Sequence, residues 1–456
     1  MIYTPHAYQK RAEDFVVSHR FCALFLDMGL GKSVITLTAL QRLRDDYLEI
    51  SRVLVIAPKS VARNTWTGEC AKWDHLQGTR VSVVMGTARQ RERALEADAD
   101  LYVTNRDNVT WLVEQYGKNL VRWPFDCVVL DESTSFKNPS SRRFKSLRKV
   151  RPYITRMILL TGTPSPNGLM DLWPQLWLLD LGQRLGRTLG TYRGLYFHPG
   201  RRNGDIVYEW VPKTGAREKI AEKIQDICLS MKAEEYIQLP DKIVMTVPVS
   251  LTDVEMKGYR TFEKEQLLQV DESSIEATTA ATLTNKLLQF TGGALYDMDH
   301  RSIEVGSSKM EALADLIEAA DEPVLVFYAY QHELERMCKA FAHLAPVHFT
   351  GEPEILSDWN LGQIRLLLCH PASVAYGLNM QQGGRIIVWY TPTWNLELYE
   401  QANARLFRQG QVKPVLIYHL IAPGTMDERV MAALSGKGSL QDELMRRIKE
   451  LKEGQR

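Results

Sequence analysis

Paired cysteines, long apolar runs and a strong excess of either charge are all missing from this chain of 456 residues. Its six cysteines form no C-x-x-C pair, which argues against a zinc site or a disulfide framework and favours free thiols in a reducing compartment. The N-terminus has no apolar segment of signal-peptide length, and apolar runs such as 324–330 are too short to span a bilayer. We therefore expect a cytoplasmic protein with no membrane partner.

Basic and acidic residues balance almost completely. Lys and Arg number 56 and Asp and Glu 55, so no overall basic field would draw the protein to nucleic acid. Any nucleic-acid contact must therefore come from a local groove. The segment 137–156 holds eight basic residues and no acidic one, and Arg201 and Arg202 form a smaller basic cluster. Each would either flank a nucleic-acid path or form an ordinary solvated surface.

Short β-branched runs recur along the chain, and helical patterns lie between them. Buried apolar strands that alternate with helices indicate parallel sheets. The runs form two sets, which predict an α/β fold of two lobes, each a parallel sheet with helices on both faces. They lie at 53–60, 81–87, 101–107, 127–133 and 156–167 in the first half, and at 324–330, 346–352, 365–373, 385–393 and 415–425 in the second.

A region of different character separates the two sets of strands. Residues 182–215 are rich in Gly and Arg, and residues 250–300 show helical patterns. We expect an N-terminal lobe over 1–228 and a C-terminal lobe over 229–456, with these two segments as a loop insertion and a helical insertion. The segment 439–454 begins with a capping box and predicts a C-terminal helix.

The stretch ALFLDMGLGKSVITLTAL, residues 23–40, looks like a G-x-x-x-x-G-K-[ST] phosphate loop without its first glycine. Leu26 occupies that position, and Gly29 lies inside the loop instead. An apolar run precedes the loop and an apolar helical pattern follows it, as a phosphate loop requires. Backbone N–H groups and Lys32 would then hold phosphates, and Ser33 would bind Mg²⁺.

A pair of carboxylates, Asp131 and Glu132, ends a buried strand downstream of this loop. Hydrolysis of a nucleotide needs one carboxylate on the metal and one to orient or deprotonate the attacking water. The same pair also occurs by chance or as a helix cap. The phosphate loop upstream favours the catalytic interpretation.

Two further signals gain meaning from that loop. Gln9 lies before the apolar face of the first helix, and its amide could pair bidentately with adenine or simply face solvent. Arg405 and Arg408 are three residues apart, so we expect them to share a helix face. They would either neutralise charge during phosphoryl transfer or form a solvated basic face.

The order of these motifs resembles that of the superfamily-2 helicase-like ATPases, and in particular their Swi/Snf branch. The resemblance runs from Tyr8 to Gln411 and implies two tandem RecA-like lobes. It rests on DMGLGKS (27–33), APKSVARNTW (57–66), DESTSFKN (131–138), LLTGTPSPN (159–167), SVAYGLNMQ (373–381), TWN (393–395) and QANARLFRQGQ (401–411).

The resemblance implies ATP and Mg²⁺ as cofactors and assigns roles to individual residues. The nucleotide would be bound by Gln9, Gly29, Leu30, Gly31, Lys32, Ser33, Gly377, Arg405 and Arg408, and the metal by Ser33 and Asp131. Catalysis would depend on Lys32, Asp131, Glu132, Arg405 and Arg408. The nucleic acid would contact Lys59, Ser60, Thr104, Asn105, Ser373 and Trp394, while Thr161, Gly162, Thr163 and Gln411 would couple hydrolysis to lobe movement.

The acidic box departs from the family pattern. Ser133 and Thr134 stand where the family often has Ala and His. Thr134 thereby replaces a residue that links the box to the coupling motif. This departure bears on the strength of coupling between ATP and DNA rather than on hydrolysis itself.

The resemblance implies a monomeric, DNA-dependent ATPase that translocates on double-stranded DNA without sequence preference and remodels protein–DNA complexes. One alternative is a strand-separating DNA or RNA helicase. Such relatives often insert a wedge hairpin between the last two motifs, where residues 382–400 leave room only for a strand and a turn. The other alternative is a nucleotide-gated nucleic-acid-binding module without turnover. The chain ends 45 residues after Gln411, which favours a compact bacterial, archaeal or viral member.

Overall fold

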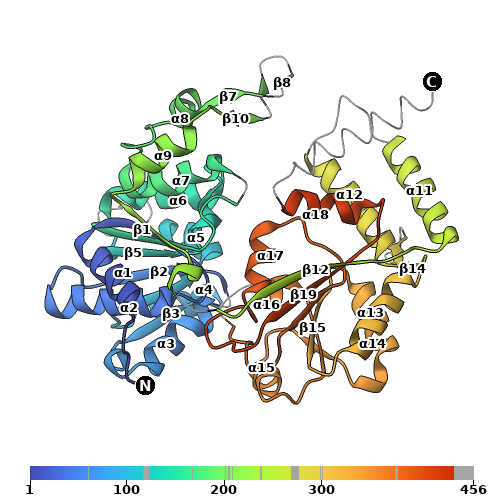
Figure 1. Cartoon of the computed structure of the whole chain (residues 1–456). Coiled ribbons are helices and arrows are strands. Elements are labelled where there is room, and N and C mark those ends of the chain that lie inside the picture. Colours follow the sequence, from blue (N-terminus) through green and yellow to red (C-terminus); the bar gives the residue numbers. More distant parts are fainter. Residues whose placement is uncertain are drawn as a thin grey trace. The chain divides into compact units, whose positions relative to one another are not determined.

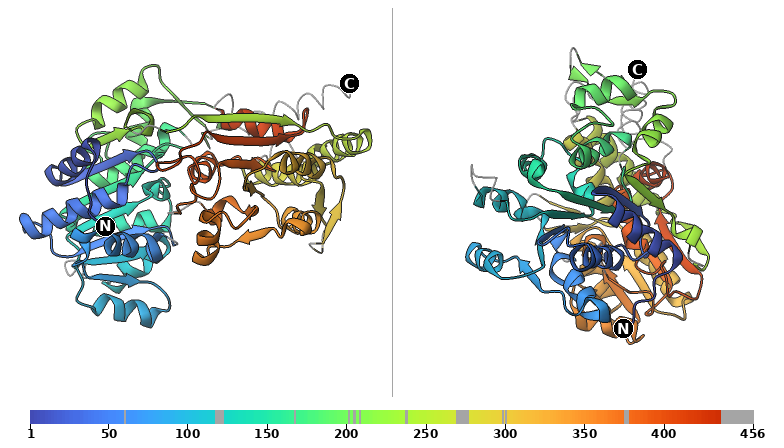
Figure 2. Two further views of the ribbon diagram at one scale, coloured as in Figure 1. Left: turned by 60° about the horizontal axis from the view of Figure 1, so that its bottom comes forward. Right: turned by 90° about the vertical axis from the view of Figure 1, so that its left-hand side faces the viewer.

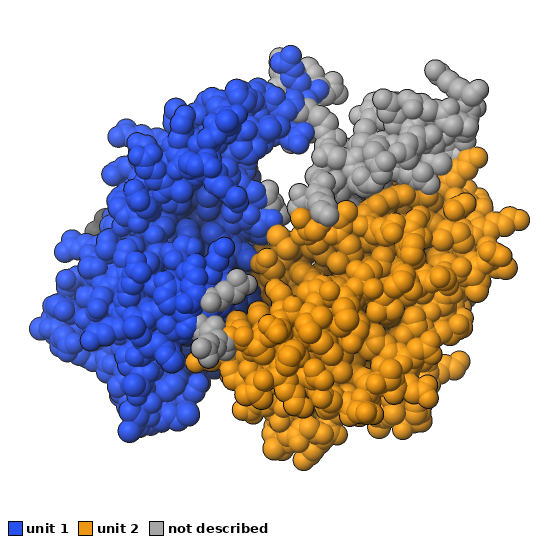
Figure 3. Space-filling model, in the orientation of Figure 1, with its two compact units in different colours: residues 1–237 blue, residues 238–456 orange. Residues whose placement is uncertain are grey.

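The computed structural model divides the chain into two compact units, residues 1–237 and 238–456 (Figure 3). It describes all residues except 60, 117–122, 167, 201, 204–205, 208, 237–238, 269–276, 298, 300, 375–377 and 436–456. For residues 203, 206, 234, 267–268 and 277–281 it describes the backbone alone. The predicted C-terminal helix at 439–454 lies outside the described residues.

A seven-stranded parallel sheet forms the centre of the first unit, in the order β11-β1-β6-β5-β2-β4-β3 (Figure 1). Its strands are β1 (Phe21–Leu26), β2 (Val53–Ala57), β3 (Val81–Val84), β4 (Leu101–Asn105), β5 (Cys127–Asp131), β6 (Arg156–Thr161) and β11 (Cys228–Met231). The helices are α1 (Ala7–Ser18), α2 (Lys32–Gln41), α3 (Trp66–Lys72), α4 (Ala88–Glu96), α5 (Val109–Gln115), α6 (Arg142–Val150), α7 (Leu172–Asp180), α8 (Leu189–Tyr196), α9 (Ala216–Ile224) and α10 (Ala233–Tyr236).

Helices cover both faces of this sheet (Figure 2), which is why its strands are continuous apolar runs. Every residue of β2, β4, β5 and β6 is buried. Alternate strand residues such as Leu54 and Leu130 share one core with Leu112 of α5 and Phe144 of α6. Since β1, β6 and β5 are parallel neighbours, the loops that follow them lie at one edge of the sheet.

The Gly- and Arg-rich segment expected as a loop insertion contains α8 and two antiparallel strand pairs. Strand β7 (Phe197–Pro199) pairs with β10 (Trp210–Pro212), and β8 (Arg202–Asn203) pairs with β9 (Ile206–Val207). These elements lie at the top of the first unit in Figure 1.

The first unit also continues past residue 228, where we expected it to end, because β11 pairs with β1 and completes the sheet.

The second unit contains a six-stranded parallel sheet in the order β12-β19-β18-β15-β17-β16. Its strands are β12 (Lys242–Pro248), β15 (Val324–Phe327), β16 (Val347–Phe349), β17 (Leu366–Cys369), β18 (Ile386–Trp389) and β19 (Val415–Ile421), beside a small hairpin of β13 (Ala294–Tyr296) and β14 (Ser302–Glu304). The helices are α11 (Asp253–Leu268), α12 (Ala277–Thr291), α13 (Ser308–Ala319), α14 (Gln331–Ala340), α15 (Pro353–Asn360), α16 (Pro371–Val374), α17 (Leu396–Asn403) and α18 (Met426–Leu434).

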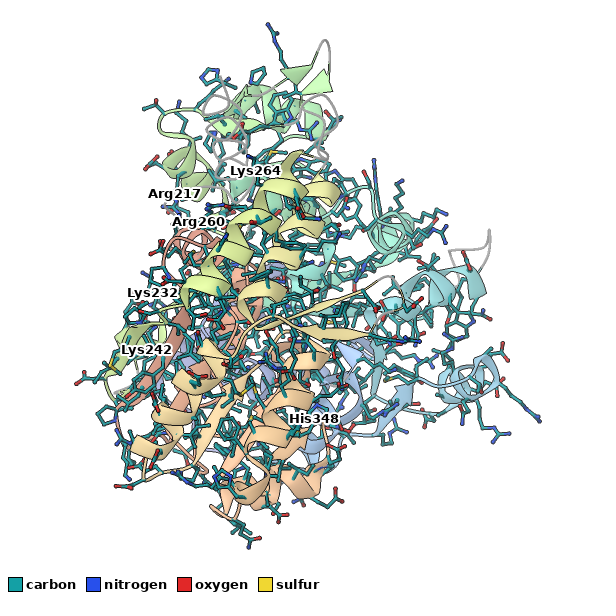
Figure 4. All side chains as sticks on the ribbon, turned by 90° about the vertical axis from the view of Figure 1, so that its right-hand side faces the viewer. Arg217, Lys232, Lys242, Arg260, Lys264 and His348 are labelled. Atoms are coloured by element: carbon teal, nitrogen blue, oxygen red, sulfur yellow. The ribbon has the colours of Figure 1, made fainter. Side chains whose placement is uncertain are left out.

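Period-2 alternation divides the residues of this second sheet between two cores. Val324 and Val326 face a core with Leu313 of α13, whereas Leu325 and Phe327 face a core with Ala402 of α17. The predicted fold class, two α/β lobes with parallel sheets and helices on both faces, is confirmed. Helices α11 and α12 fall in the expected helical insertion, and Arg260 and Lys264 are exposed on α11 (Figure 4).

No helix in the described parts of either unit is both long and apolar enough to cross a membrane.

Candidate nucleotide-binding site

The glycine-rich loop connects β1 to α2, as the sequence predicts. Gly29 and Gly31 have φ angles of 86° and 83°, in the left-handed region that side chains disfavour. A Cβ on Gly31 would lie 2.7 Å from Nε2 of Gln9, so a side chain at this position would displace the Gln9 amide. Asp27 anchors the start of the loop, because its Oδ2 accepts a hydrogen bond from the Ala233 backbone N–H at 2.9 Å. Leu30 is fully buried inside the loop.

The Lys32 ammonium folds back over this loop. Its Nζ donates to the carbonyl oxygens of Leu26 at 2.7 Å and Asp27 at 3.3 Å. The loop that follows β6 lies close by, since a Cβ on Gly162 would be 3.8 Å from Nζ. Lys32 therefore lies between the loop after β1 and the loop after β6, with Ser33 beside it at the start of α2 and half-buried.

Gln9 contacts the glycine-rich loop from α1. Its Oε1 accepts a hydrogen bond from the His6 backbone N–H at 2.9 Å, which makes it the third residue of a capping box. Its Nε2 donates to the Leu30 carbonyl at 3.4 Å. The side chain is 7% exposed and is neither an ordinary surface glutamine nor a free amide.

Asp131 is the last residue of β5 and is buried. Its Oδ2 accepts a hydrogen bond from Nε1 of Trp66 at 3.0 Å. Burial raises the pKa of the Asp131 carboxyl, and the Trp66 bond and the Lys32 charge oppose that rise. No role was predicted for Trp66, which lies 65 residues earlier and reaches Asp131 because β2 and β5 are neighbours.

Glu132 has a strained backbone. Its φ of 52° places a non-glycine residue in the left-handed region directly after the strand. The Thr161 hydroxyl donates to Glu132 Oε2 at 3.3 Å and accepts a hydrogen bond from the Thr163 backbone N–H at 3.2 Å. The end of β6 therefore holds the Glu132 carboxylate in position.

Two residues expected to contact nucleic acid differ from that expectation. The Thr104 side chain is fully buried and donates to the Val84 carbonyl at 2.8 Å, because its strand position points inward. Asn105 is 7% exposed, and its Oδ1 accepts from the Asn108 backbone N–H at 3.2 Å, which caps a 3₁₀ turn. Lys59 is exposed, and Ser60 lies outside the described residues.

In the second unit, Arg405 and Arg408 lie beyond the end of α17 at Asn403, so they do not share a helix face. They nevertheless converge, since Nη1 of each donates to the Leu378 carbonyl, at 3.1 Å and 2.8 Å respectively. The loop before β19 is held by Gln411, whose Nε2 donates to the carbonyls of Gln381 and Gly384 at 3.0 Å each.

The remaining candidates of the second unit differ in exposure. Trp394 is 49% exposed. Ser373 is half-buried, and its hydroxyl donates to the His370 carbonyl at 2.7 Å. Gly377 lies outside the described residues.

The sequence family described as SNF2-related domain matches residues 8–292, more than half of the chain. The protein belongs to this family. The protein is similar over nearly its whole length to "Putative protein p41" of Acyrthosiphon pisum secondary endosymbiont phage 1. It is 37% identical over 98% of this chain and 99% of its own.

The protein is also similar to "DNA repair and recombination protein RAD54-like" of two animals. Identity is 25% for Drosophila virilis, over 93% of this chain and 60% of the relative, and 24% for Gallus gallus, over 94% and 65%. The chain thus spans less than two thirds of these relatives. Among solved structures, the Sulfolobus solfataricus SWI2/SNF2 ATPase core in complex with dsDNA is 21% identical, with a TM-score of 0.46 over 96% of this chain and 92% of that one.

Proposed function

We propose that this SNF2-related protein is a DNA-dependent ATPase motor that couples ATP hydrolysis to translocation on double-stranded DNA and so remodels protein–DNA complexes. The observation that carries the proposal is the set of groups at one edge of the first sheet. A lysine in a glycine-rich loop, a buried carboxylate and a second carboxylate held by a threonine follow three neighbouring strands. Membership of the SNF2-related family supports the use of ATP.

The residues of this edge fit ATP with magnesium. The left-handed backbone at Gly29 and Gly31, at the start of α2, suits a loop whose N–H groups bind phosphate. Lys32 supplies positive charge to the phosphates, while the Ser33 hydroxyl and the Asp131 carboxylate are hard oxygen ligands that suit Mg²⁺. Gln9, held against the loop by its Leu30 bond, would donate to and accept from the adenine ring. Bound Mg²⁺ would stabilise the charge on the transferring phosphoryl group.

Glu132 would act as the base that orients water and takes its proton. Thr161 holds this carboxylate through its oxygen Oε2, and in that position the carboxylate would accept a hydrogen bond from water. Arg405 and Arg408 would neutralise developing negative charge, and their shared bond to the Leu378 carbonyl means that they would be positioned together. We assign Thr161, Gly162, Thr163 and Gln411 to coupling, as the sequence predicts.

Double-stranded DNA as the partner is supported by the RAD54-like relatives, whose name describes DNA repair and recombination. Exposed basic residues are available on helix α6, which carries Arg142, Lys145, Arg148 and Lys149 and no acidic residue. Lys59, Ser373 and Trp394 would add contacts at the loops after strands. Phosphate contacts suffice for movement along a duplex, so we expect binding that is independent of sequence and sensitive to salt.

Duplex translocation is favoured over strand separation by the segment 382–400. Strand β18 and the first residues of α17 lie within it, and the short stretches beside them leave no room for a wedge hairpin. We further propose that the protein acts as a monomer in the cytoplasm of a prokaryotic cell or of a virus-infected host cell.

The decisive experiment measures ATP hydrolysis without nucleic acid and with duplex DNA, single-stranded DNA or RNA. Glu132→Gln should abolish turnover, and Glu222→Gln, at an exposed glutamate of α9, should leave it intact. Stimulation by duplex DNA alone would support the motor and lead to a triplex-displacement assay. Stimulation mainly by single strands or RNA would indicate an unwinding helicase. Binding without turnover would indicate a nucleotide-gated binding module.

A further inference from the structure

A buried hydrogen-bonded bridge connects the acidic box to the coupling segment. The Ser133 hydroxyl donates to Oε1 of Gln175 at 2.7 Å. Nε2 of Gln175 donates to the carbonyls of Pro164 at 2.7 Å and Asp171 at 2.8 Å. Both side chains of the bridge are 0% exposed. One amide from α7 therefore joins the end of β5 to the loop that follows β6.

The bridge uses the hydrogen-bonding groups of the Gln175 amide almost completely. Its oxygen accepts from Ser133, and its nitrogen has two N–H groups with two carbonyl partners. Because an amide is planar, these partners have fixed directions, and a shift of Pro164 must be followed by Gln175 or break a bond. A displacement of the loop after β6 would therefore reach Ser133, the direct neighbour of Glu132.

The same two segments are also joined directly, on the side of the carboxylates, by the Thr161–Glu132 bond of 3.3 Å. Two connections of this kind make the segments move as one body. Glu132 at the same time has its left-handed backbone, and the Thr163 hydroxyl is buried without a hydrogen-bond partner among the described residues. Strain and an unsatisfied polar group are expected where a segment changes between two arrangements.

We propose that Gln175 and Ser133 are positioning residues that transmit movement of the segment Thr161–Pro164 to Glu132, and so couple DNA engagement to hydrolysis. This inference rests on the proposed function. The bridge gives the acidic box a connection to the coupling segment that does not depend on Thr134. Gln175 and Ser133 would not touch the nucleotide. They would act on hydrolysis through the position of Glu132.

The test compares ATP turnover with and without saturating duplex DNA in Ser133→Ala, Gln175→Leu and the double variant. We expect the ratio of stimulated to unstimulated turnover to fall roughly tenfold, within the range typical of coupling between sites, while the KM for ATP stays the same. The double variant should lose no more than either single variant, since each change removes the same bridge. Alanine is small and common at this box position in the resembled family, so Ser133→Ala should fold.

The matched control is Ser82→Ala. Ser82 is also buried in the first unit, at 9% exposure, and donates to the Ala94 carbonyl at 2.7 Å between β3 and α4. It should keep the wild-type ratio. Wild-type stimulation in Ser133→Ala, or an equal loss in Ser82→Ala, would overturn the inference and leave the motor intact. A wild-type protein that no nucleic acid stimulates would instead overturn the proposed function, and the inference with it.

Discussion

Both units bury charged side chains, but among the described residues the first unit alone does so next to a strained backbone, that of Glu132. In the first unit, Asp131 is buried with a raised pKa, and Glu132 beside it has a left-handed backbone. In the second unit, Lys309 and Asp427 form an ion pair of 2.6 Å with exposures of 1% and 0%.

The hydrogen-bond and ion-pair partners of Asp427 and Asp131 explain the contrast between the two units. Asp427 accepts hydrogen bonds from the Thr291 hydroxyl at 2.8 Å and the Ala422 backbone N–H at 3.0 Å, in addition to its bond to Lys309. A buried pair with this many partners ties α12, α13 and α18 to the sheet. Asp131 has a neutral donor, Trp66, and no comparable ion-pair contact among the described residues. A buried charge therefore suggests a ligand site only where its partners leave part of that charge unbalanced.

The contrast predicts first that substitutions of the half-buried Lys32 and of the buried Lys309 have different effects. Lys32→Ala should lower ATP turnover roughly 1,000-fold, because the phosphates lose their charged partner, with little change in thermal unfolding. Steady-state turnover and a thermal melt of the same preparation measure both effects. Lys213→Ala is the control, since Lys213 is half-buried like Lys32 and also donates to a backbone carbonyl, that of Gly194. A large loss of stability in Lys32→Ala would mean that Lys32, like Lys309, mainly stabilises the fold.

Breaking the pair in the second unit should cost stability instead. Lys309→Met leaves the Asp427 carboxylate buried and uncompensated, which should lower the free energy of unfolding by about 3 kcal/mol or more. Denaturant unfolding followed by circular dichroism measures the change.

Lys413→Met is the matched control for this prediction, because Lys413 pairs with Glu322 at 3.3 Å and is 60% exposed. Its loss should cost less than about 1 kcal/mol. Equal effects of the two substitutions would contradict the structural role of the buried pair.

The buried Glu333 carboxyl should make the second unit less stable at neutral pH than near pH 4. Burial raises the pKa of this carboxyl from its ordinary 4.5 to about 6, although the Thr391 hydroxyl and two backbone N–H groups donate to it. The folded state then holds a proton that the unfolded state has lost, so stability falls as pH rises between those values. The loss amounts to about 2 kcal/mol above pH 6.

Glu333→Gln should remove that part of the pH dependence and raise the unfolding midpoint at pH 7. Melts from pH 4 to pH 8 measure the slope, and the exposed Glu354→Gln should keep the wild-type profile. An unchanged slope in Glu333→Gln would mean that this carboxyl is not the group responsible.

The smallest expected effect is a change in melting temperature, and its sign distinguishes Asp131 from Asp427. A raised pKa means that the Asp131 carboxylate costs stability above its ordinary pKa, and that the cost is absent at lower pH where it is protonated. Asp131→Asn should therefore raise the melting temperature of the nucleotide-free protein at pH 7, while abolishing turnover. Asp427→Asn should lower the melting temperature, because it strands Lys309. The same sign for both variants would remove the distinction between the two sites.

Local features of the candidate site were predictable from the sequence because short-range sterics set them. Gly29 and Gly31 adopt the left-handed conformations that such a loop requires, and Lys32 begins the helix after it. The position of Thr104 was not predictable in this way, since the resemblance assigned it to the nucleic-acid contacts and the sequence does not show which way its side chain points. It is the fourth residue of a fully buried five-residue strand, and the alternation of that strand turns its hydroxyl inward.

Arg405 and Arg408 do come together, but not for the reason that the sequence predicted. The three-residue spacing predicted a shared helix face, but α17 ends two residues before Arg405. Their convergence comes from the Leu378 carbonyl, a backbone group 27 residues before Arg405 that no local pattern could identify.

By itself the sequence determined the two α/β halves, the order of the motifs and the chemistry available at each strand end, since periodicity and loop composition are local properties of the chain. Only the tertiary structure decided which of these groups meet. Trp66 reaches Asp131, Gln175 joins Ser133 to Pro164, and Thr161 holds Glu132. The physical reason is that such contacts depend on strand order in the sheet, where neighbours such as β5 and β2 lie tens of residues apart in the chain.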